Sequence, residues 1–127
     1  MSIEQDFANN LFAFMEETFE AKHHGIFLDK GTSLFETLET VSAQEASIPV
    51  GGKCASLAAQ VAHVTFYMEV LERIVMFNDT SRADWGEIWR TVEKVTPAEW
   101  DNYKRRWCIN RKIGTIRLSE VKSYAVL

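Results

Sequence analysis

The sequence contains few of the residues that build disulfide, redox or metal scaffolds: two cysteines, three histidines and two prolines among 127 residues. Cys54 and Cys108 are isolated, so the chain has no CxxC pair of the kind that binds zinc or exchanges disulfides. A structural disulfide is not expected in a reducing compartment. Both cysteines are therefore predicted to be free thiols at core or half-buried positions.

Long apolar runs are also absent. The chain has no span of about 20 apolar residues, the length that a membrane-crossing helix requires. Its first residues, MSIEQDFANN, contain neither the basic nor the apolar part of a signal peptide. We therefore expect a cytoplasmic protein with no membrane partner. A chain of this length can bury one sizeable core, so residues 1–127 are predicted to form a single domain.

Catalytic sequence motifs are missing as well. The sequence contains no phosphate-binding glycine loop, no nucleophile elbow and no HExxH. The tripeptide Gly51-Gly52-Lys53 follows no predicted strand and lacks the other glycine of a P-loop. No catalytic residue is therefore predicted, and the carboxylates are expected on solvated faces of amphipathic helices.

The charge is unevenly distributed along the chain. The net charge of −4 argues against a nucleic-acid partner. Residues 1–100 contain 16 acidic and 7 basic residues, a net charge of −9, whereas residues 101–127 contain 2 acidic and 7 basic residues, a net charge of +5. The basic tail therefore differs in composition from the rest of a small domain.

Helix starts are predicted where serine or threonine is followed three residues later by glutamate or glutamine, a pattern known as the capping box. Four such pairs are present: Ser2 with Gln5, Ser33 with Glu36, Ser42 with Glu45, and Thr96 with Glu99. Pro97 occupies the favoured first helical position after Thr96. The segment 48–52, IPVGG, predicts a break between helices.

The first predicted helix is amphipathic. Apolar residues recur every fourth position, at Ile3, Phe7, Leu11, Met15 and Phe19. The helix is expected to end or kink at residues 22–25. Glu16, Glu17 and Glu20 are assigned to its polar face.

The most apolar predicted helix runs from Cys54 to about Met76. One stripe contains Leu57, Val61, Val64, Met68, Leu71 and Val75, and a second contains Phe66, Tyr67, Val70 and Ile74. A polar wedge is left around Thr65, Glu69, Glu72 and Arg73. His63 lies on the flank of the second stripe, so it is predicted to point between helices and to need a hydrogen-bond partner or a metal.

The remaining segments complete an all-α protein. Residues 78–82 are a predicted polar loop, residues 83–95 a short helix or helical turn, and the helix after Thr96 has an apolar stripe of Trp100, Tyr103 and Trp107. Ile109, Ile113 and Ile116 lie about 180° from that stripe on a continuous helix. We predict an up-and-down four-helix bundle whose last helix is truncated or aberrant.

Three segments resemble the DinB/YfiT-like superfamily: residues 27–38 (FLDKGTSLFETL), 46–49 (ASIP) and 58–68 (AAQVAHVTFYM). The resemblance extends over about residues 3–106, and the helix that contains His63 is its most specific part. It implies a four-helix bundle with a divalent metal, nickel or zinc, bound by one histidine of the second helix and an HxxxH pair of the last helix. Members of the superfamily are similar to thiol S-transferases or hydrolases that act with a low-molecular-weight thiol.

In this sequence only His63 matches that ligand set, because no HxxxH follows it. A truncation or a shifted reading frame after about Arg106 would account for the missing ligands and the atypical tail 107–127 together; a divergent short member of the superfamily is the alternative. His23 and His24 are adjacent, so at most one of them could join His63 as a ligand. Their other interpretation is a solvent-exposed helix end.

Two functions remain open from the sequence. The first is a degenerate or truncated relative with an incomplete metal site, which binds a divalent ion weakly or not at all and acts without catalysis as a homodimer or an interaction module. The alternative is a metal-dependent thiol S-transferase or hydrolase with a small thiol substrate.

Overall fold

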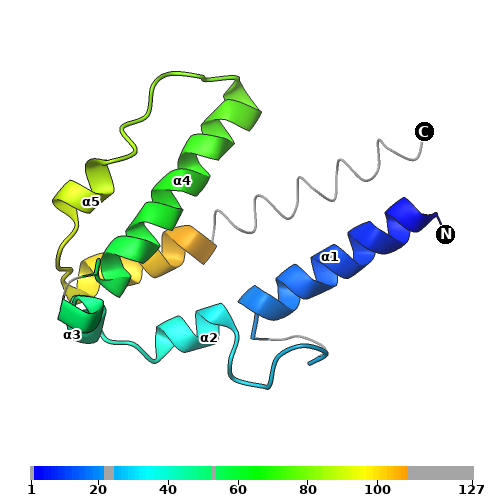
Figure 1. The fold of residues 1–127 in the computed structure, drawn as a ribbon, viewed down its shortest axis with the longest axis horizontal. Helices are drawn as coiled ribbons and strands as arrows, with labels where there is room; N and C mark the ends of the chain where they lie inside the picture. The colour runs from blue at the N-terminus through cyan, green and yellow to red at the C-terminus, as the bar shows by residue number, and fades with distance from the viewer. Residues whose placement is uncertain (1, 22–24, 53, 109–127) are drawn as a thin grey trace. The chain divides into compact units, whose positions relative to one another are not determined.

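The structure is a computed structural model that describes residues 2–21, 25–52 and 54–108. In chain order the helices are α1 (Ile3–Phe19), α2 (Leu34–Glu39), α3 (Ala43–Ala46), the 3-10 turn η1 (Val50–Gly52), α4 (Leu57–Phe77) and α5 (Glu87–Thr91) (Figure 1). Residues 97–108 are also helical. These described ranges contain no β-strand, only an isolated bridge between Pro49 and Ser56. The predicted all-α class is confirmed.

The chain divides into two compact units, Met1–Val41 and Ser42–Leu127. The prediction of one domain over residues 1–127 therefore stays a prediction, and each unit has its own architecture. Among the described residues, none of the helices combines the length and the apolar content that crossing a membrane requires.

The first unit is built on α1. Ser2 caps the helix, because its hydroxyl accepts a hydrogen bond from the N–H of Gln5 at 3.3 Å. The side chain of Gln5 donates to Asn9 at 3.1 Å. Near the end of α1, Phe19 contacts Phe35 of α2 with ring centroids 6.1 Å apart. The earlier apolar positions are exposed: Ile3, Phe7, Leu11 and Phe14.

The prediction that Glu17 lies on the polar face of α1 is wrong. Its side chain is only 2% exposed. One carboxylate oxygen accepts a hydrogen bond from the N–H of Ile26 at 3.0 Å, and the other accepts from the N–H groups of Phe27, at 2.5 Å, and Leu28. Consecutive N–H groups form an anion-binding concavity, and hydrogen bonds to a charged acceptor are the strong ones. Glu17 therefore holds residues 26–28 against α1.

The second unit contains α3, α4, α5 and the helix of residues 97–108. Two predicted capping boxes form here: Glu45 accepts from the Ser42 N–H at 2.9 Å, and Glu99 accepts from the Thr96 N–H at 2.7 Å. These backbone hydrogen bonds lower the pKa values of Glu45 and Glu99. In the first unit the box of Ser33 and Glu36 forms as well. The predicted break is confirmed by η1, where Gly51 and Gly52 have positive φ angles.

The exposure predicted for α4 is partly wrong. Thr65, assigned to the polar wedge, is 1% exposed, and its hydroxyl donates to the Val61 carbonyl at 2.8 Å. Leu71 and Val75, assigned to the buried stripe, are exposed. The other buried residues of the helix are Ala58, Ala59, Val61, Ala62 and Val70. Most of them are small, so neighbouring segments can approach α4 closely on the face that carries them. Thr65 can be buried there because its hydroxyl is hydrogen-bonded within the helix.

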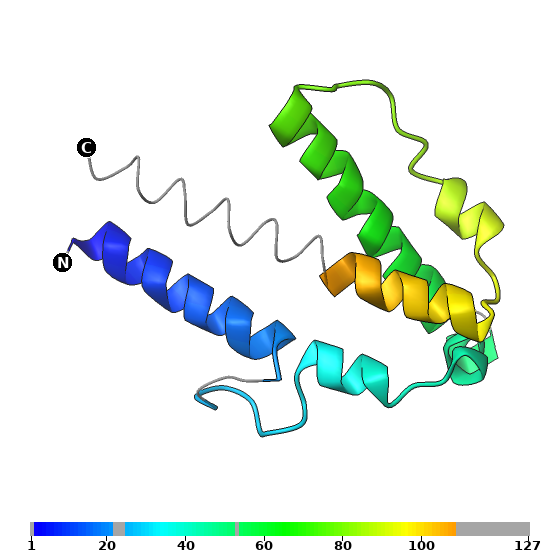
Figure 2. The same ribbon diagram turned by 180° about the vertical axis from the view of Figure 1, so that it is seen from behind.

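The helix of residues 97–108 crosses α4, as Figure 2 shows. Its predicted apolar stripe is confirmed at both ends, because Trp100 and Trp107 are buried. Arg106 donates from Nε at 2.9 Å and from Nη2 at 2.5 Å to Oε1 of Glu69 on α4. Glu69 therefore makes a tertiary ion pair. Residues 109–127, including Ile109, Ile113 and Ile116, lie outside the described residues.

Two serine hydroxyls hold the segment between α5 and residue 97. Ser56 accepts from the Ala59 N–H at 3.2 Å, which caps α4, and donates to the Glu93 carbonyl at 3.1 Å. Ser47 accepts from the Val95 N–H at 2.9 Å and donates to the Ala43 carbonyl at 2.7 Å. The segment that follows α5 is therefore fastened to the end of α3 and to the start of α4.

Replacing Glu17 by glutamine tests the role of its carboxylate. The amide keeps the shape but has one acceptor oxygen in place of two and no charge, so we expect a local loss of about 1–3 kcal/mol. Hydrogen exchange measured by NMR should become faster at the amides of Ile26, Phe27 and Leu28. Glu16→Gln is the control, since Glu16 is exposed on the same helix turn; equal exchange in both variants would contradict the assignment.

Ser56→Ala removes both the cap of α4 and the hydrogen bond to Glu93. Loss of a serine cap alone costs about 1 kcal/mol, so the free energy of unfolding in urea should fall by at least that amount. Thr80→Ala, a change at an exposed loop position, should leave it nearly unchanged. A Ser56→Ala variant as stable as Thr80→Ala would show that neither bond contributes.

Candidate functional site

His63 is the residue that the sequence predicts as a metal ligand, and it lies in the part of the chain that the structure describes. It lies in the second turn of α4 and is partly buried. Its imidazole stacks on the indole of Trp89 in α5, with ring centroids 4.4 Å apart and planes at 29°. Its Nδ1 is buried and has no hydrogen-bond partner among the described residues. The imidazole therefore lies between two helices, as predicted.

His63 belongs to a larger aromatic cluster. Its ring centroid is 6.4 Å from that of Tyr67, and Tyr67 is 5.0 Å from Trp85. Phe66 meets Trp85 edge to face at 5.9 Å. The aromatic cluster therefore consists of His63, Phe66, Tyr67, Trp85 and Trp89. Tyr67, Trp85 and Trp89 each keep about 45% of their surface exposed, which leaves aromatic surface facing outward.

Trp85 and Trp89 both lie in the segment 83–95, which the sequence predicts as a short helix or helical turn. Part of the signal for the cluster lies in the spacing of His63 and Tyr67, which are four residues apart and so share one face of α4. Trp85 lies in the turn before α5, and Trp89 lies within α5. Their contacts with α4 therefore depend on how that turn is folded.

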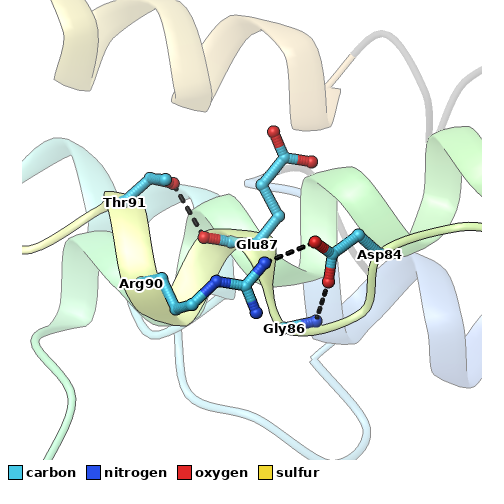
Figure 3. A network of polar contacts seen from close by, with 5 residues as sticks. All are labelled: Asp84, Gly86, Glu87, Arg90 and Thr91. Carbon is cyan, nitrogen blue, oxygen red and sulfur yellow. Dashed lines mark hydrogen bonds and ion pairs between the residues drawn. The ribbon is translucent and has the colours of Figure 1, made fainter.

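A polar network of Asp84, Gly86, Glu87, Arg90 and Thr91 fixes the start of α5, the helix that contains Trp89 (Figure 3). Asp84 accepts hydrogen bonds from the N–H of Gly86, at 3.1 Å, and from the guanidinium of Arg90. The Thr91 hydroxyl donates to the carbonyl of Glu87 at 2.8 Å. A Cβ on Gly86 would lie 2.5 Å from the Arg90 guanidinium, so glycine leaves the space through which Arg90 reaches Asp84.

The hydrogen bond from Arg90, followed by that from the Gly86 N–H, lowers the pKa of Asp84. A carboxyl whose pKa is lowered on folding stabilises the fold above its ordinary pKa, and this contribution is lost as the pH falls through the lowered value. Asp84 and Arg90 are both more than half exposed. The network therefore makes a modest, local contribution to stability.

The surroundings of His63 do not fit the three-histidine metal site that the family resemblance implies. The rings against its imidazole are those of Trp89 and Tyr67. No group of three histidine, cysteine or acidic side chains with metal-binding geometry occurs in the described part of the chain. His23 and His24 lie outside that part. His63 can thus supply one nitrogen ligand, and its role as a metal ligand stays a prediction.

The remaining candidates are the cysteines. Both are free thiols, as predicted. Cys108 is half-buried, whereas Cys54 is exposed in the segment that precedes α4, so the prediction of a core or half-buried position is wrong for Cys54. The sequence predicts a helix from Cys54, whereas α4 begins at Leu57, so Cys54 lies before the helix.

Comparisons with models of protein families, with curated proteins and with solved structures find no match to this chain.

The stacking of His63 on Trp89 predicts a distinct effect for each tryptophan. Trp89→Ala should move the ring-proton resonances of His63 downfield by removing the indole ring current, and should cost about 1 kcal/mol beyond the lost apolar burial. Trp85→Ala is the matched control, since Trp85 contacts Phe66 and Tyr67. NMR of the histidine region tests this, and equal shifts in the two variants would contradict the stacking.

Proposed function

We propose that this protein is a degenerate or truncated relative of the DinB/YfiT-like superfamily, with an incomplete divalent-metal site, and that it acts without catalysis as a homodimer. In this proposal its helices form an up-and-down four-helix bundle with an atypical last helix. The residues that resemble the superfamily and the position of His63 on the long helix support the family assignment. The single observation that carries the non-catalytic function is the exposed apolar surface of α4.

That surface, the outer face of α4, is formed by large apolar side chains. Its members are Tyr67, Leu71, Ile74 and Val75, with exposed fractions from 37% to 78%. Covering apolar surface contributes about 25 cal/mol per Å², and contiguous patches of this kind mark interaction sites. In a dimer with twofold symmetry the same patch is buried twice, so self-association supplies the cover.

The donor set argues against a three-histidine enzyme. A catalytic zinc site needs three protein ligands and an open position. The chain has His63 on α4 and the adjacent pair His23 and His24, which cannot both face one ion from a single helix. The imidazole of His63 is also packed against Trp89. These residues support a binding protein rather than a metalloenzyme.

The proposed homodimer is tested by sedimentation velocity. The wild-type chain should sediment as a dimer, and Val75→Glu should shift it toward monomer, because a carboxylate would be buried in the contact. Val75 is 78% exposed, so the fold of each chain should persist, with an unchanged circular dichroism spectrum. Gln60→Glu is the control, because it places the same charge at an exposed polar position of α4. A wild-type monomer, or a Val75→Glu dimer of unchanged affinity, would contradict the proposal.

One observation favours the alternative, a metal-dependent thiol S-transferase or hydrolase. The Nδ1 of His63 is buried and has no partner among the described residues, and buried polar atoms are normally satisfied. Calorimetric titration of the untagged protein with nickel or zinc separates the two functions. We expect binding weaker than micromolar that His63→Ala does not change. Submicromolar binding that is lost in His63→Ala would favour the alternative.

A further inference from the structure

We draw no further inference here: the strongest candidate, the aromatic surface that Tyr67, Trp85 and Trp89 expose beside the outer face of α4, adjoins the surface already proposed for self-association, and nothing in the structure shows what covers it.

Discussion

Unpaired backbone N–H groups are the constraint on which this structure depends. Several helices are short, with six residues in α2, four in α3 and five in α5, so most of their N–H groups lie in the first turn and lack an acceptor within the helix. Serine or threonine precedes each helical segment of the described chain except η1 and α5. The same need extends to the loop after α1, where Glu17 accepts from residues 26–28. Side-chain oxygens therefore determine where helices begin and how residues 26–28 pack back against α1.

How much could be predicted from the sequence depends on the distance along the chain over which each interaction acts. The capping boxes of Ser33, Ser42 and Thr96 join residues three apart, so the sequence predicts them and the helix starts. Glu17 bonds to groups nine to eleven residues away, and periodicity places it on the wrong face. For α4, burial follows where neighbours approach closely rather than how apolar each side chain is, which explains the burial of Thr65 and the exposure of Leu71.

The candidate site shows the same division. The position of His63 between helices follows from its place on a single helix, and the structure agrees. Its partner Trp89 lies 26 residues further along, and their stacking depends on how α5 is fastened by Asp84, Ser47 and Ser56. Composition cannot supply that geometry. The resemblance to a metal-binding superfamily predicts His63 as a metal ligand, which stays a prediction, and the rings of Trp89 and Tyr67 lie against its imidazole.

The carboxylates at the ends of the helices share one further consequence. Glu4, Glu45 and Glu99 each accept hydrogen bonds at the first turn of a helix, and Asp79 and Asp84 do so in the turns on either side of residues 80–83. The pKa values of these five carboxyl groups are all lowered. Protonation therefore weakens the hydrogen bonds that they accept, and does so together as the solution becomes strongly acidic. The ring contacts of Phe19 with Phe35 and of His63 with Trp89 involve no carboxylate. We therefore expect strong acid to loosen the capped helix starts and the turns while the interiors of the helices persist.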